Sequence, residues 1–283
     1  MEKKLLKTIK IGKTFSDKLK KDHVSAYSAM SSYFLIMSFV PFLMLLLSLA
    51  KYLPFTADDV MNLLKSISLV SENSFLQSIL DEIFSHSNFS IMGLTIITLL
   101  WAASKGVWAM IQGFNSVYDI EESRNTLILR IISMFYTLAL MLVIIITLIL
   151  LVFSFSIHSY VNLHFPRLAP IAVMLVNLRG FFSLFFLTGF FLLLYIFIPA
   201  RKTTIKDEMV GAVFASLGWS VFSFAFSIYV SRFSSYTKIY GSLGTVLLFF
   251  LWLYMLMYIM YVGAEINFFL SEKGYHKMRS FWH

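Results

Sequence analysis

The sequence predicts an all-α, polytopic integral membrane protein with six transmembrane helices. Hydrophobic residues make up 59% of the chain and charged residues 13%, whereas soluble domains hold roughly 45–50% and 25%. The mean hydropathy is +0.79, and the apolar residues form runs long enough to cross a bilayer. These runs lie at about residues 26–49, 91–113, 130–157, 171–198, 209–230 and 242–270, within a membrane domain of residues 26–271.

Residues 1–25 predict a basic amphipathic helix on the cytoplasmic leaflet. Eight lysines lie between positions 3 and 21, and five apolar residues follow one helical stripe: Leu5, Leu6, Ile9, Phe15 and Leu19. Such segments bind anionic lipid; a frayed basic tail is the alternative. The next run is longer than the 7–15 residues of a signal-peptide core, so it should remain as a membrane anchor.

The longest polar insertion, residues 54–88, predicts two short amphipathic helices in the first outer loop. Thr56-x-x-Asp59 and Ser74-x-x-Gln77 resemble helix starts with reciprocal capping, and helical apolar spacing follows each. Residues 272–283 form a short charged tail. Sixteen Lys and Arg lie on one predicted side of the bundle and five on the other. The positive-inside rule therefore places both termini in the cytoplasm.

Lys105 lies inside the second predicted span, where a charge is costly and faces a partner, a cavity or the bundle interior. At about 1.5 Å per residue, Lys105 lies some 12 Å from the cytoplasmic end of its helix and Glu265 some 8 Å from that end of the sixth. Arg179 lies roughly 12 Å below the outer end of the fourth span. Lys105 and Glu265 could meet if their helices are neighbours.

Two interpretations of these charges stay open. In one, Lys105 and Arg179 line a cavity that attracts an anionic group, and Glu265 is the coupling or pairing acid. In the other, Lys105 and Glu265 form a structural ion pair, and Arg179 extends to the outer headgroups. Asn115, Tyr118 and Asn267 would shape the cytoplasmic mouth. A small, hydroxylated face of the fifth span is either packing or a cavity wall; it contains Ala212, Ser216, Ser220, Ser223 and Ser227.

Enzyme signatures are absent from the sequence, and no catalytic residue, metal ligand or cofactor is predicted. The chain has no cysteine, and it contains no HExxH, GxSxG or phosphate-binding GxxxxGK[ST] motif. His86, His158 and His164 all fall on the predicted outside, where loop histidines are a simpler interpretation than a metal site. No basic surface with interleaved aromatics indicates nucleic acid.

Three segments in order resemble the YihY/virulence-factor BrkB family of bacterial inner-membrane proteins. They are YFLIMSFVP from Tyr33, LWAASKGVWAMIQGFNSVYDIEESRN from Leu100, and YGSLGTVLLFFLWLYMLMYIMYVGAEINFF from Tyr240. The resemblance implies six helices and a multi-pass protein of the inner membrane. The family has carried a ribonuclease label, which the residues do not support. Its implied signature positions are Trp101, Lys105, Gly106, Asn115, Tyr118, Glu122, Arg124, Gly241, Gly244, Trp252, Gly263, Glu265 and Asn267.

The function predicted from these features is a transporter or flippase-like carrier of an anionic amphiphile or lipid-linked solute. The residues expected to bind it are Lys105, Arg179, Glu265, Asn115, Tyr118, Asn267, Ser216, Ser220 and Ser223. Membrane lipids are the expected partners. A second copy of the chain, in a homo-oligomer, or an envelope protein is a further expected partner. The alternative is a non-transporting scaffold for envelope assembly that holds partners through small-residue faces and the outer helices.

Overall fold

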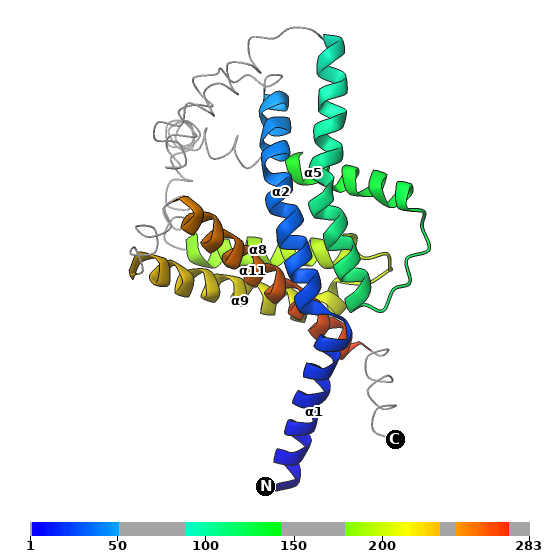
Figure 1. Cartoon of the computed structure of the whole chain (residues 1–283). Coiled ribbons are helices and arrows are strands. Elements are labelled where there is room, and N and C mark those ends of the chain that lie inside the picture. The colour runs from blue at the N-terminus through cyan, green and yellow to red at the C-terminus, as the bar shows by residue number, and fades with distance from the viewer. Residues whose placement is uncertain (1, 51–88, 143–178, 233–241, 272–283) are drawn as a thin grey trace, which may run out of the picture. The chain divides into compact units, whose positions relative to one another are not determined.

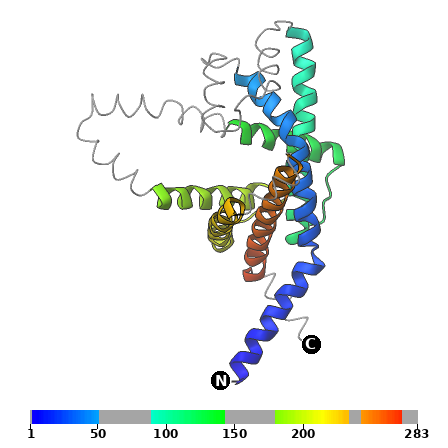
Figure 2. The ribbon, with the colours of Figure 1, turned by 60° about the vertical axis from the view of Figure 1, so that its left-hand side comes forward.

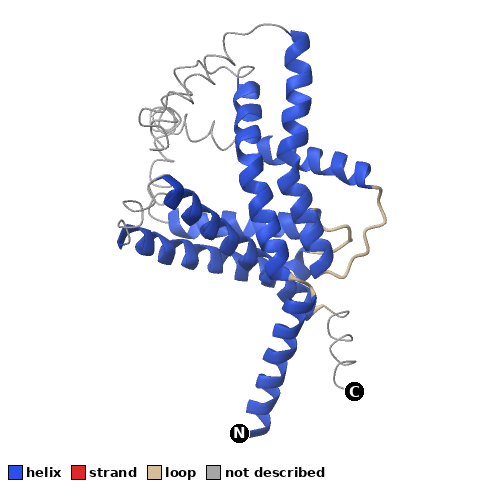
Figure 3. Ribbon diagram, viewed as in Figure 1, coloured by secondary structure: helices blue, strands red, loops and turns tan. Residues whose placement is uncertain are grey.

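A computed structural model describes residues 2–50, 89–142, 179–232 and 242–271, and within them the chain is helical without strands (Figures 1 and 3). The predicted outer insertion, the end of the third predicted span, the start of the fourth, the turn before the sixth and the C-terminal tail lie outside the described residues. The helices are α1 (Glu2–Lys21), α2 (Val24–Ala50), α5 (Phe89–Val117), the helix Thr126–Leu142, α8 (Arg179–Phe197), α9 (Ile205–Arg232) and α11 (Ser242–Leu270).

Two of these helices are long and apolar enough to cross a membrane. They are Ile205–Val230 within α9 and Val246–Leu270 within α11, which match the predicted fifth and sixth spans. Helix α9 carries large apolar side chains on its exposed surface, among them Leu217, Val221 and Phe224, as expected of a surface that lipid covers. The described parts of the third and fourth predicted spans are the shorter apolar helices Thr126–Leu142 and Ser183–Phe197. The number six therefore stays a prediction.

The chain forms two compact units. The first contains Met1–Phe34, Trp108–Arg124 and Asn177–His283, and the second contains Leu35–Val107 and Asn125–Val176. In the first unit, α9 packs against both α8 and α11, and α1 contacts α11 (Figures 1 and 2). In the second unit, Leu45, Leu100 and Met141 form a small apolar core.

Local sequence explains where several helices begin and end. Thr204 and Asp207 cap the start of α9, because the Thr204 N–H and Oγ1 both donate to the Asp207 carboxylate at 3.2 and 2.6 Å. Asn125 caps the helix Thr126–Leu142 through a bond from the Leu127 N–H to its Oδ1 (3.2 Å). At the end of α5, Ile120 N–H donates to Asn115 O and Asp119 N–H to Ser116 O, with Asp119 at a φ of 51°. This is a Schellman motif.

Small residues bring α9 and α11 into backbone contact. A Cβ at Gly211 would overlap the Gly263 carbonyl oxygen and the Asn267 side chain. A Cβ at Gly263 would overlap the Tyr195 hydroxyl and approach the Gly211 carbonyl oxygen to 2.8 Å. Glycine at these positions lets membrane helices approach closely.

The substitution Gly211→Ala tests this contact. We expect it to lower stability by about 1–3 kcal/mol, because the new methyl group must push two backbones apart. Gly189→Ala is the matched control, since a Cβ there meets no atom within 4 Å and alanine favours a helix by roughly 0.5–1 kcal/mol. Melting temperatures in detergent, followed by tryptophan fluorescence, compare the two variants. A Gly211→Ala protein that melts with the wild type would contradict a tight α9–α11 contact.

Candidate functional site

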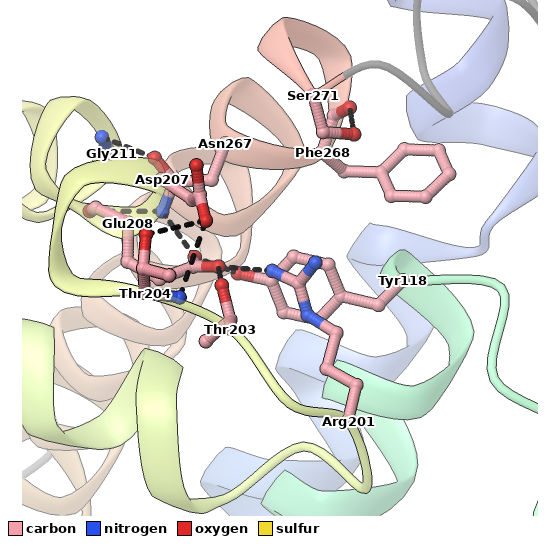
Figure 4. A network of polar contacts seen from close by, with 10 residues as sticks. All are labelled: Tyr118, Arg201, Thr203, Thr204, Asp207, Glu208, Gly211, Asn267, Phe268 and Ser271. Carbon is pink, nitrogen blue, oxygen red and sulfur yellow. Dashed lines mark hydrogen bonds and ion pairs between the residues drawn. The ribbon is translucent and has the colours of Figure 1, made fainter.

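A buried polar network joins the ends of four helical segments in the first unit, and its centre is Glu208 (Figure 4). The Glu208 side chain is fully buried, one turn inside α9. The Tyr118 hydroxyl and Asn267 Nδ2 donate to Oε2 at 2.8 and 2.9 Å. Thr203 Oγ1 donates to Oε1 at 2.7 Å, and Arg201 forms an ion pair with the same oxygen. We call these five residues the Glu208 network.

Arg201 belongs to this network through its position as well as its charge. Its guanidinium carbon lies 3.6 Å from the centre of the Tyr118 ring, a distance at which cation–π attraction is strong. The Arg201 Nε atom is buried and has no hydrogen-bond partner among the described residues. The same guanidinium therefore neutralises the charge of Glu208 and covers the ring of Tyr118.

Burial and the neighbouring charges together determine the protonation of Tyr118. Burial raises the pKa of Tyr118 well above its usual value, and the nearby Glu208 carboxylate raises it further. The phenol consequently keeps its proton and remains a hydrogen-bond donor. A carboxylate with four donors is a stable, satisfied group, so we assign this network to holding the helix ends together.

Asn115 and Asn267 form further hydrogen bonds near the Glu208 network. Asn267 Oδ1 accepts from the Gly211 N–H at 2.6 Å, which fixes the close approach of α9 and α11. Asn115 Nδ2 donates to Glu122 Oε2 at 2.7 Å. Arg124 donates to both oxygens of Glu122 and thereby lowers the pKa of that carboxyl. These contacts fix the loop that follows α5.

A second ionic cluster lies beside the Glu208 network. Lys18 forms ion pairs with Asp22 and with Glu265 of α11, the latter at 2.7 Å. Its ammonium lies 4.3 Å from the centre of the Phe268 ring, and that ring in turn contacts Tyr118. We call Lys18, Asp22 and Glu265 the Lys18 cluster. It connects the end of α1 to the end of α11.

Lys105 belongs to the second unit, and its side chain is exposed. Trp101, four residues earlier, is 45% exposed on the same helical face. Arg130 from the helix Thr126–Leu142 lies with its guanidinium carbon 4.9 Å from the Trp101 ring centre and donates to the Trp101 carbonyl oxygen at 2.6 Å. We call Trp101, Lys105 and Arg130 the Lys105 surface.

The other predicted binding residues, Ser216, Ser220, Ser223 and Arg179, differ in their surroundings. Ser216 Oγ is 2.8 Å from Thr188 Oγ1 of α8, which favours packing for this serine. Ser220 is exposed and donates to the Ser216 carbonyl oxygen, whereas Ser223 Oγ is buried without a partner among the described residues. Arg179 is the first residue of α8, and its side chain lies outside the description.

The structure places Tyr118 and Asn267 on the same oxygen of Glu208, and Asn115 on Glu122. The cytoplasmic mouth that these three residues were expected to shape stays a prediction. Glu265 has Lys18 as its ion-pair partner. Arg201, Glu208, Lys18 and Asp22 were not predicted as site residues. The sequence held one clue to Glu208, because Thr204-x-x-Asp207 has capping-box spacing and marks a helix start before Met209.

The described helices and their apolar surfaces define an all-helical protein suited to a bilayer, and comparison with known proteins identifies the family. The profile of the family described as Virulence factor BrkB matches residues 15–280, so the chain belongs to this family. The predicted membership is therefore confirmed.

Relatives that cover nearly the whole chain include the following two. A putative ribonuclease-like protein YfkH of Bacillus subtilis (strain 168) is 33% identical over 87% of this chain and 90% of its own length. A UPF0761 membrane protein of Haemophilus influenzae (strain 86-028NP) is 24% identical over 93% of this chain and 96% of its own length. No solved structure matches the chain. The family is one of membrane proteins.

Glu208→Ala tests whether the Glu208 network holds the helix ends. We expect a loss of about 3–5 kcal/mol, because removing one partner of a buried ion pair leaves Arg201 uncompensated. Glu121→Ala is the control, since Glu121 is exposed in the loop after α5 and such changes stay within about 0.5 kcal/mol. The melting temperatures of both variants in detergent, compared with that of the wild type, test this prediction. Equal melting temperatures would show that the network contributes nothing to stability.

Proposed function

We propose that the protein is a membrane carrier for an anionic amphiphile, a phosphate-bearing lipid or lipid-linked solute, and that the Lys105 surface binds its charged group. The observation that carries the proposal is the exposed ammonium of Lys105 in the middle of the apolar helix α5. An ionisable residue at such depth is a functional-site candidate, because insertion of its charge costs roughly 3 kcal/mol without a partner.

The neighbours of Lys105 suit an amphiphile with an anionic head. Trp101 supplies an exposed aromatic surface for the apolar part, and aromatic rings with a polar tip are common at lipid headgroups. Arg130 adds a second cation next to that ring, although it is itself only 8% exposed. A phosphate offers several acceptor oxygens to such donors.

The proposal is of a binding and carrier function without catalysis. Among the described residues, no group of three His, Asp or Glu side chains could hold a metal ion. Glu208 is buried, and its two oxygens already have Tyr118, Asn267, Thr203 and Arg201 as partners. The alternative of an envelope scaffold depends chiefly on residues 54–88, which lie outside the described residues.

Lipid movement in vesicles tests the carrier. The purified protein is reconstituted with fluorescent phosphatidylglycerol or phosphatidylcholine, and dithionite quenching measures transfer between leaflets. We expect transfer of the anionic lipid to exceed that of the zwitterionic one. Lys105→Gln should lower the anionic rate roughly tenfold, because a hydrogen bond to a charged group contributes about 1.5 kcal/mol.

Lys206→Gln is the matched control, because Lys206 is an exposed lysine at the start of α9. It removes the same charge and should leave the rate unchanged. Equal rates for Lys105→Gln and the wild type, or no transfer by the wild type, would overturn the proposal.

A further inference from the structure

The Lys18 cluster has two carboxylates and one ammonium in a buried place. The side chains of Asp22 and Glu265 are 6% and 0% exposed, and that of Lys18 is 15% exposed. Both carboxylates contact the same Nζ atom. If both acids were ionised, the cluster would hold one net negative charge.

Within the described part of the chain, no second cation lies against Glu265. The charged groups that face Glu265 from the packed elements are Lys18 and Asp22. The end of α5 contributes the Val117 carbonyl oxygen, which accepts from Lys18 at 3.2 Å, and Ser116 Oγ, which donates to the Asp22 carbonyl oxygen at 3.0 Å. Phe268 covers the ammonium with its ring.

Glu265 also lacks hydrogen-bond donors. Both of its carboxylate oxygens are buried, and neither has a hydrogen-bond partner among the described residues. The approach of Lys18 Nζ to Oε2 at 2.7 Å is an ion pair outside the angular range of a hydrogen bond. A fully buried carboxylate with one shared cation and no hydrogen-bond donor is strongly unfavourable.

Two acids that share one site reduce this cost by keeping a proton. We propose that Asp22 and Glu265 hold one proton between them, so that the Lys18 cluster is a proton-binding site that joins the first described helix to the last. Protonated, the cluster is neutral: one carboxylate pairs with Lys18 and the other acid is a carboxylic acid. Deprotonated, it contains two carboxylates that repel each other across one ammonium.

This proton site goes beyond the proposed carrier function and does not depend on it. The carrier was argued from the Lys105 surface of the second unit, whereas the Lys18 cluster lies entirely in the first unit. The proton is detected by spectroscopy on the resting protein, so failure of lipid transfer and failure of this inference are separate results.

Infrared difference spectroscopy of the full chain in lipid nanodiscs tests the proposal. A carboxylic acid has a C=O stretching band that is distinct from that of a carboxylate and shifts in heavy water. We expect the wild type to show this band at neutral pH and to lose it at alkaline pH. Glu265→Gln and Asp22→Asn should each abolish it, because the remaining carboxylate then has Lys18 to itself.

Lys18→Met changes the band in the opposite direction and guards against an effect of misfolding. Without the ammonium, both acids should be protonated at neutral pH, and the band should grow about twofold. Glu121→Gln is the control, because this exposed acid is already ionised at neutral pH. A wild-type protein without the band, or a band that persists in both Glu265→Gln and Asp22→Asn, would overturn the proposal.

Discussion

The burial of Glu208 is the constraint on which the first unit depends. A carboxylate with no access to water must find its donors within the protein, and Glu208 finds them on three separate segments: Tyr118 after α5, Arg201 and Thr203 before α9, and Asn267 near the end of α11. Together these contacts hold the helix ends in the arrangement that the structure shows. The apolar surfaces of the helices do not specify that arrangement, because lipid is as apolar as their side chains.

Glu208 and the Lys18 cluster solve the same problem differently. Glu208 has Arg201 and three uncharged donors, so its charge is matched and its oxygens are satisfied. Glu265 shares one lysine with Asp22 and has no such donors among the described residues. The first arrangement is suited to permanence, and the second is suited to gaining and losing a proton. The rings of Phe268 and Tyr118, whose centres are 6.3 Å apart, lie between the Glu208 network and the Lys18 cluster.

The sequence predicted where the helices lie along the chain better than it predicted which helices pack against one another. Long apolar runs locate α2, α5, α9 and α11, because a helix that spans a membrane can be recognised from its long run of apolar residues. The sequence also grouped Asn115, Tyr118 and Asn267 at an expected cytoplasmic mouth, and the structure places two of them, Tyr118 and Asn267, on one oxygen of Glu208. Depth says nothing about which helices touch, so the partner of Glu265 could not be inferred.

Lys18 was missed because its sequence context predicts a topological signal. It is one of eight lysines before the first span, and nothing in its spacing distinguishes it from the others. Arg201 and Glu208 were missed because the fifth span was expected to begin at Met209, whereas α9 begins at Ile205. Contacts of this kind depend on tertiary packing, which neither periodicity nor charge pattern encodes.

The glycine contact between α9 and α11 has a mechanical consequence. Gly211 and Gly263 allow the two backbones to touch near the end that carries Glu208 and Asn267. The contact continues along both helices, because a Cβ at Gly218 would lie 2.9 Å from Ile259 and the ring centres of Trp219 and Trp252 are 6.1 Å apart. Helices α9 and α11 are therefore braced over this length and should move as one body.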